Sequence, residues 1–197
     1  MSHTQQPTDQ ADSDDALSTS TSHDEPALSV WTVQPGSHTF TSDKIKNWVE
    51  RYLSGSVLNL CAGPTQLDHE GPVLRNDIDA SLDTDLSIDA QLISSCLPSN
   101  SIDTVVFDPP FSVYQSNLRY DGQQVGHAKV AKEGFDELLR MGGTVIELGY
   151  HGSCMPARLG YDRVERAWFC TTGRHKDVLG SVDRKVQTEL TGGGVDD

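Results

Sequence analysis

The chain has 197 residues, of which 29 are acidic and 15 are basic, and its formal net charge is −14. This length suits a single domain with a core of ordinary size. No stretch is long and apolar enough to cross a membrane, and the polar N-terminus lacks a signal-peptide pattern, so we expect a cytoplasmic protein with no membrane partner. The four cysteines are widely spaced single residues, which argues against a disulfide scaffold and against a metal site.

The charge balance is typical of proteins that work at high salt. Aspartate outnumbers glutamate, and the chain has only six lysines. Self-repulsion between acidic residues keeps a protein soluble, and molar salt reduces the range of that repulsion to about 3 Å. The composition therefore predicts a halophilic protein, of haloarchaeal or haloviral origin.

Both ends of the chain are predicted to be disordered. Residues 1–28 carry six acidic residues and no lysine or arginine, and they contain too little apolar surface to fold. The Gly-rich end, residues 187–197, carries the same expectation. The folded domain is accordingly predicted at residues 29–186.

The first predicted element is an amphipathic helix. Ser42 is a suitable N-cap residue, and the apolar residues from Ile45 to Leu53 fall on one helical face. Gly55 follows directly and ends the helix.

A buried strand at residues 57–61 comes next and runs into Ala62 and Gly63. A glycine at this point lets a ligand approach the backbone closely. Only about nine residues separate Gly63 from the next strand, which is at or below the usual minimum for a full crossover helix. We therefore expect either a helix of one or two turns or irregular chain between the two strands.

Two further strands end in acidic residues. Residues 73–79 predict the second strand, which closes with Asp77 and Asp79, and residues 86–90 predict a brief third strand that closes with Asp89. A short helix is expected to follow over residues 90–98. Because parallel strands end at the same edge of a sheet, these carboxyl groups are expected to lie together there.

The fourth strand, residues 104–107, ends in Asp108-Pro109-Pro110-Phe111. Two consecutive prolines donate no backbone hydrogen bonds and bias the preceding residues toward extended conformations, so the turn is stiff. A carboxylate, a rigid carbonyl and an aromatic ring therefore project from the carboxyl end of a central strand. Ligands bind at that edge of open α/β sheets.

The rest of the chain predicts a helix, a strand and a terminal hairpin. The elements are a loop at residues 112–125, a helix at 126–141 ended by Gly142 and Gly143, a strand at 144–150, and a hairpin of strands at 163–170 and 178–183.

The turn at Asp108 resembles motif IV of the S-adenosylmethionine-dependent amino-methyltransferases, among them the DNA N6-adenine methyltransferases, and residues 57–65 resemble motif I of that family. The resemblance covers about residues 40–185. It implies an α/β fold with a Rossmann-like class I methyltransferase sheet, mostly parallel with a C-terminal antiparallel hairpin, in which some crossover helices are shortened.

The resemblance implies S-adenosylmethionine as cofactor. Asp77 would bind the ribose hydroxyls, with Asp79 as the alternative, and Asp89 would accept a hydrogen bond from the adenine amine. Two positions depart from the family pattern: Asn59 replaces an acidic residue and Thr65 replaces a glycine. The residues assigned to the cofactor are Asn59, Cys61, Ala62, Gly63, Asp77, Ile78, Asp89, Ala90 and Asp108.

The resemblance also implies how the turn acts. In the family, the acidic side chain and the carbonyl of the first proline accept hydrogen bonds from the target amine, and the aromatic ring stacks on the base. An aniline-like nitrogen is a poor nucleophile, and two acceptors on its N–H groups direct its lone pair toward the sulfonium methyl. The implied catalytic residues are Asp108, Pro109, Pro110 and Phe111.

Nucleic acid is the expected partner, although the protein is acidic overall. Residues 119–185 hold 11 basic and 9 acidic side chains, whereas the remainder of the chain carries a net charge of −16. We expect adenine N6 in DNA to be the target, and guanine N2 in RNA is the alternative. No recognition insert follows the turn, which fits loose specificity or a partner that supplies specificity. The residues assigned to the substrate are Phe111, Tyr114, Arg174 and Lys176.

Two other interpretations remain open. A non-catalytic protein that keeps the methyltransferase fold is favoured by Asn59, Thr65 and the short first crossover. The intact turn at Asp108 argues against it. A methyltransferase for small amines would explain the acidity of the chain but not the aromatic ring at Phe111.

Overall fold

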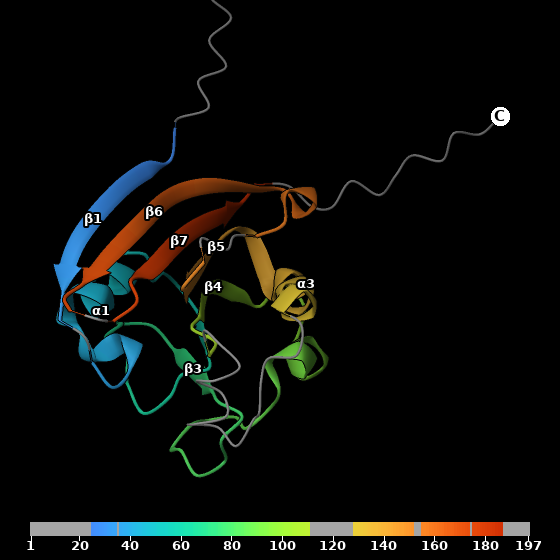
Figure 1. The fold of residues 1–197 in the computed structure, drawn as a ribbon. Helices are drawn as coiled ribbons and strands as arrows, with labels where there is room; N and C mark the ends of the chain where they lie inside the picture. The colour runs from blue at the N-terminus through green and yellow to red at the C-terminus, as the bar shows by residue number, and fades with distance from the viewer. Residues whose placement is uncertain (1–24, 35, 111–127, 152–154, 174, 187–197) are drawn as a thin grey trace, which may run out of the picture.

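The fold is given by a computed structural model that describes residues 25–34, 36–110, 128–151, 155–173 and 175–186. A seven-stranded sheet runs through this part of the chain (Figure 1). Its elements are β1 (Ala27–Val33), η1 (Thr39–Thr41), α1 (Asp43–Glu50), β2 (Val57–Leu60), β3 (Val73–Asn76), η2 (Ala90–Ser95), β4 (Ile102–Phe107), α3 (Ala128–Leu138), β5 (Leu139–Gly149), η3 (Ala157–Leu159), β6 (Tyr161–Thr171) and β7 (Val178–Lys185).

The strand order is β1-β6-β7-β5-β4-β2-β3. Strand β2 pairs in parallel with β3 and with β4, and β4 pairs in parallel with β5. Only β7 runs against its neighbours, since it is antiparallel to both β5 and β6. This arrangement confirms the predicted fold class, including the C-terminal hairpin.

Helices cover both faces of the central strands. On one face, Trp48 of α1 packs edge-on against Phe169 of β6, with ring centroids 5.5 Å apart. On the other face, Phe135 of α3 packs against Phe107 of β4, with centroids 5.4 Å apart. Because both faces are covered, all four residues of β2 are buried, which accounts for its mostly apolar sequence, in which Asn59 is the one polar residue.

The predicted third strand is wrong. Within residues 86–90, only Leu86 forms a bridge, to Asn76 of β3. The Asn76 side chain makes the backbone hydrogen bonds that strand pairing would have made. Its Nδ2 donates to the Ile88 carbonyl at 2.9 Å, and its Oδ1 accepts from the Ile88 N–H at 3.0 Å. Asp89 then caps η2 by accepting from the Gln91 N–H, and η2 is a short 3-10 helix within the predicted helical segment.

The predicted end of the second long helix is also wrong. Helix α3 ends at Leu138, and the chain enters β5 at the next residue, so Gly142 and Gly143 lie inside a strand. Ile102 of β4 pairs with Leu139 and Thr104 pairs with Thr144, which leaves β5 with extra residues that bulge. Gly142 has a φ of +79°, which glycine adopts readily, so the glycines form this bulge.

The N-terminal half of the domain differs from the prediction at several boundaries. Helix α1 ends at Glu50, three residues before the predicted end, and Ser42 stands at its N-cap without a side-chain cap bond. Irregular chain joins β2 to β3, which was one of the two predicted alternatives. Strand β1, whose pairing with β6 was not predicted, begins at Ala27, two residues before the predicted domain boundary. Within the described chain, no helix has the length and apolar character needed to cross a membrane.

Candidate active site

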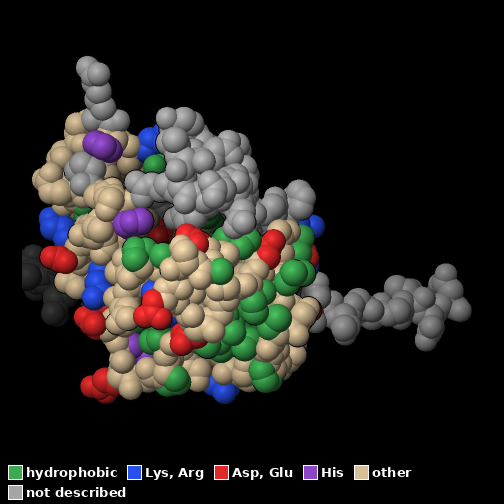
Figure 2. Space-filling view, turned by 90° about the horizontal axis from the view of Figure 1, so that it is seen from below, with side chains coloured by type: hydrophobic (Ala, Val, Ile, Leu, Met, Phe, Trp, Pro, Cys, Tyr) green, Lys and Arg blue, Asp and Glu red, His purple; other side chains and the backbone are tan. Residues whose placement is uncertain are grey.

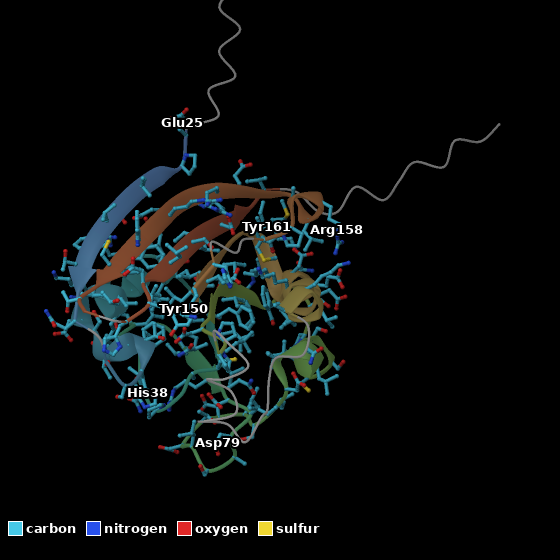
Figure 3. All side chains as sticks on the ribbon, in the orientation of Figure 1. Glu25, His38, Asp79, Tyr150, Arg158 and Tyr161 are labelled. Carbon is cyan, nitrogen blue, oxygen red and sulfur yellow. The ribbon has the colours of Figure 1, made fainter. Side chains whose placement is uncertain are left out.

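The site lies where β2, β3 and β4 end, at the lower edge of the sheet in Figure 1. Figure 2 looks onto this edge, where acidic, basic and histidine side chains are interspersed. His38, which precedes η1, and Asp79, which follows β3, both lie at this edge in Figure 3. Segments far apart in the sequence therefore meet at the edge where a ligand is expected.

A loop that contains Gly63 follows β2. The Gly63 N–H donates to Asp77 Oδ2 at 2.8 Å, and the Gly63 carbonyl accepts from Arg75 Nη2 at 2.8 Å. Gly63 has a φ of +57°, and apart from its two chain neighbours no described residue has an atom within 4 Å of the position that a Cβ would occupy. The two hydrogen bonds thus hold the loop in place while its glycine faces open space.

Cys61, two residues earlier, lies within electrostatic range of three of the predicted carboxyl groups. Burial raises the pKa of its thiol, and the charges of Asp77, Asp108 and Asp89 raise it further. The charges of three acidic residues from different segments therefore act on one residue. Cys61 also has a φ of 58°, a left-handed conformation that costs a residue with a side chain about 1–2 kcal/mol.

Asp77 and Asp79, the two alternatives for the ribose, occupy different surroundings. Asp77 is 3% exposed, and its Oδ1 accepts from the Asp79 N–H at 3.0 Å while its Oδ2 accepts from the Gly63 loop. Asp79 accepts instead from the Ser81 N–H at 2.9 Å, and its hydrogen bonds to Ser81 lower its pKa. Of the two, it is Asp77 that contacts the glycine loop.

Asp108 follows β4 directly, and its N–H continues the ladder to the Leu60 carbonyl at 3.3 Å. The Thr39 hydroxyl, which belongs to η1, donates to Asp108 Oδ1 at 3.2 Å. Burial raises the pKa of Asp108 to about 7, and the hydrogen bond from Thr39 opposes this rise. The carboxyl group can therefore exchange a proton near neutral pH. Phe111 and Tyr114 lie outside the described residues.

Asn59 in the middle of β2 has a buried and unsatisfied amide. The residue is 0% exposed, and neither its Nδ2 nor its Oδ1 has a hydrogen-bond partner among the described residues. A buried polar group without a partner costs about 1–3 kcal/mol. The amide is therefore suited to a water or a ligand that supplies the missing partners.

Lys176, which the sequence analysis assigned to the substrate, lies in the turn between β6 and β7, and its ammonium stands 5.0 Å from the centre of the Tyr150 ring. Tyr150 follows the carboxyl end of β5, so the pair lies at the same edge as Asp108. Arg174 lies outside the described residues. Ile78 is partly buried after β3, and Ala90 is buried at the start of η2.

Three residues that support the site were not predicted. Asn76 holds the segment that carries Asp89, Arg75 holds the glycine loop, and Thr39 contacts Asp108. An asparagine directly before the acidic strand end was a weak signal for the first. Thr39 has no local signal, because its partner lies 69 residues away. No cluster of metal-ligating side chains occurs among the described residues.

No family model matches the chain, and no curated protein sequence matches it. Solved structures do match its fold. TrmN from Thermus thermophilus superposes with a TM-score of 0.53 and 15% sequence identity over 74% of this chain and 49% of that one. The chain has the Rossmann-like methyltransferase fold. It spans about half the length of the Thermus thermophilus structure.

Two other matches show how broadly this fold is used. The N-methyltransferase NodS from Bradyrhizobium japonicum WM9, in complex with S-adenosyl-L-homocysteine, has a TM-score of 0.53 and 11% identity over 74% of this chain and 87% of that one. The [4+2]-cyclase SpnF has a TM-score of 0.51 and 11% identity over 82% of this chain and 88% of that one. Since one fold carries such different chemistry, function has to be argued from the site residues.

Proposed function

We propose that this protein is an S-adenosylmethionine-dependent methyltransferase that acts on an exocyclic amine of a nucleobase, with adenine N6 in DNA as the expected acceptor. The observation that carries the proposal is the position of Asp108. Its carboxyl group follows the central strand β4, precedes two prolines and lies at the same sheet edge as the open Gly63 loop. The match to NodS, an N-methyltransferase with S-adenosyl-L-homocysteine bound, supports this pairing of fold and chemistry.

The residues around the glycine loop fit the cofactor by their chemistry. Gly63 offers backbone next to open space, and the Asn59 amide has a donor and an acceptor that need partners. The carboxylates of Asp77 and Asp89 keep lone pairs for hydroxyl or amine donors beyond the backbone N–H groups they already accept from. The proposed cofactor residues are Asn59, Cys61, Ala62 and Gly63 for the methionine part, Asp77 and Ile78 for the ribose, Asp89 and Ala90 for the adenine, and Asp108 near the methyl group.

The cofactor, when bound, supplies an electrophilic methyl group on a sulfonium. Asp108 and the Pro109 carbonyl accept hydrogen bonds from the acceptor amine and so orient its lone pair. The methylated nitrogen then has to lose a proton. Because burial raises the pKa of Asp108 to about 7, its carboxylate is basic enough to receive that proton. Phe111 is proposed to stack on the base.

A nucleic-acid acceptor is supported by the surroundings of the site. The amine of a base that is paired and stacked in a duplex cannot reach the active site, so the base has to be flipped out of the stack. Lys176 lies exposed at the same edge and, among the described residues, has no carboxylate within 4 Å, so it is suited to a phosphate. Tyr114 and Arg174 are proposed to join it in the substrate contact, and a partner protein is proposed to supply sequence specificity.

Guanine N2 in RNA is the second candidate acceptor, because the turn at Asp108 suits either exocyclic amine. A non-catalytic binding protein is the second candidate class. It is favoured by Cys61, which occupies a left-handed position in the loop at a cost that glycine would avoid.

The test is transfer of radiolabelled methyl groups from S-adenosylmethionine, in molar KCl, to unmodified duplex DNA and to unmodified RNA in parallel. Calorimetric titration with the cofactor is carried out on the same protein. Label in DNA supports the adenine proposal, and label in RNA alone moves the acceptor to guanine N2. Cofactor binding without transfer to either polymer would point to a missing partner protein or to a different acceptor, and no binding would favour the non-catalytic protein.

Two variants separate binding from transfer. Asp108→Asn is expected to abolish transfer while cofactor affinity stays within about threefold. Asp77→Ala is expected to weaken cofactor binding by about 1.5–3 kcal/mol, the value of a hydrogen bond to a charged acceptor. Asp79→Ala is its matched control, because Asp79 bonds to Ser81 rather than to the loop. Equal losses in Asp77→Ala and Asp79→Ala would contradict the assignment of the ribose to Asp77.

A further inference from the structure

The Thr39 hydroxyl reaches Asp108 from an element outside the parallel strands. Its Oγ1 donates to Asp108 Oδ1 at 3.2 Å, and the two residues are 69 positions apart in the sequence. Among the described residues, no other side chain donates to Asp108. One carboxylate oxygen is thus occupied, and Oδ2 has no protein donor in the described part of the chain.

The segment that carries Thr39 is held in place by its neighbours. Phe40 is 5% exposed and belongs to the core on the α1 face of the sheet. The Thr41 hydroxyl donates to the His38 carbonyl at 2.6 Å, which closes the short turn of η1. Gly36 approaches so closely that a Cβ there would stand 1.8 Å from Thr41 Oγ1. Thr39 is therefore presented by a fixed turn rather than by a free side chain on a loop.

We infer that Thr39 is a positioning residue, whose hydroxyl holds Oδ1 of Asp108 so that Oδ2 is presented to the acceptor amine. This inference rests on the proposed function. A carboxylate with one oxygen held cannot rotate freely, and a misplaced catalytic group costs a large factor in rate. The hydroxyl also stabilises the ionised form of Asp108, since it donates a hydrogen bond to the carboxylate.

Other titratable groups lie on the elements around this end of β4, and their effects have to be separated from that of Asp108. They are His38 beside η1, Cys61 after β2, Asp77 after β3, Asp89 before η2, Tyr150 after β5, and the buried ion pair of Glu147 on β5 with Lys132 on α3. Of these, His38 directly precedes η1, the turn that carries Thr39. The pH profile of His38→Asn therefore shows whether the acidic limb belongs to that histidine.

The experiment compares Thr39→Val, which keeps the shape and removes the hydroxyl, with Thr39→Ser, which keeps the hydroxyl. Thr32→Val, an exposed threonine on β1, is the matched control. We expect Thr39→Val to lower kcat at least tenfold with cofactor affinity unchanged, and to move the acidic limb of the pH profile up by about 0.5–1 pH unit, the equivalent of one ordinary hydrogen bond. Thr39→Ser is expected to restore both values to within about threefold and 0.2 pH unit.

The pKa of Asp108 measured by carboxyl carbon NMR gives a readout that needs no turnover. If the wild-type protein transfers no methyl group, the proposed function fails, whereas a rise in the Asp108 pKa in Thr39→Val would still support the contact. If the wild type is active but Thr39→Val matches Thr32→Val in kcat, pH profile and NMR, the inference is overturned. A loss in Thr39→Val that Thr39→Ser does not restore would also overturn it.

Discussion

Replacing Asn76 by alanine is expected to lower the free energy of unfolding by about 2–3 kcal/mol. The side chain is 1% exposed and makes two hydrogen bonds to the backbone of Ile88, at 2.9 and 3.0 Å. Each net bond contributes about 1 kcal/mol, and the Ile88 N–H and carbonyl lose their partners when the amide is removed. Because Ile88 is only partly buried, water can hydrogen-bond to its freed N–H and carbonyl, and the expected loss of stability lies near about 2 rather than about 3 kcal/mol.

Two variants control for the size and the charge of the change. Asn47→Ala removes the same amide from the exposed face of α1 and is expected to change stability by less than about 0.5 kcal/mol. Asn76→Asp keeps an acceptor for the Ile88 N–H but sets a carboxylate oxygen against the Ile88 carbonyl. It is expected to destabilise at least as much as alanine at pH 7, and less once the carboxyl is protonated and can donate.

Urea unfolding in molar KCl gives the free energies, and the slope of each curve shows whether the folded state stays equally compact. Hydrogen exchange at the Ile88 amide gives a local readout, since its protection depends on Asn76. If Asn76→Ala unfolds at the same urea concentration as Asn47→Ala and the Ile88 amide exchanges no faster, then Asn76 does not replace the missing strand.

Three other predictions test the surroundings of the site. Cys61→Gly is expected to be more stable than Cys61→Val by about 1–2 kcal/mol in urea, because a β-branched residue is strained at a φ of 58°. The pKa of Asp108 is about 7 in the folded protein, above its value in the unfolded chain, so the wild type loses stability as pH rises from about 4 to 7. The asparagine of Asp108→Asn carries no charge, so at about pH 8 this variant is expected to have a free energy of unfolding about 2–4 kcal/mol higher than the wild type. Lys132→Met is expected to lower the free energy of unfolding by about 3–5 kcal/mol, because it removes the ammonium that lies 2.7 Å from the buried Glu147 carboxylate. The double variant with Glu147→Leu is expected to regain most of this stability in the same assay.

The parts of the fold that followed from sequence are those with a local cause. A short segment of mostly apolar and β-branched residues marks a strand covered on both faces, so β2 and β4 were predicted from their own sequences. Gly63 permits the left-handed backbone of its loop because it has no Cβ, and the prolines after Asp108 restrict the backbone through their rings. Parallel topology then brings both to one edge, and the structure places them there.

The parts that sequence missed depend on distant partners. Residues 86–90 have the composition of a strand, but a side chain of β3 took over the hydrogen bonds that strand pairing would have used. Gly142 looks like a helix stop, and only the register between β4 and β5 makes it part of a bulge. Strand β1 has strand-forming residues in Val30, Trp31, Thr32 and Val33, but its pairing with β6 joins residues more than 130 positions apart, so its place in the sheet could not be predicted locally.

High salt affects the exposed and the buried charges of the site differently. At molar ionic strength, interactions between exposed charges fade within about 3 Å, whereas those of buried groups are screened much less. Asp77 is 3% exposed and adds with Asp108 and Asp89 to the negative field at Cys61, so a positively charged ligand such as a sulfonium is favoured there even in high salt. The exposed Lys176 is screened, so its attraction for a phosphate is weak under the same conditions. At high salt, the proposed nucleic-acid substrate would therefore depend mainly on the proposed stacking and on the proposed hydrogen bonds to Asp108, rather than on phosphate contacts.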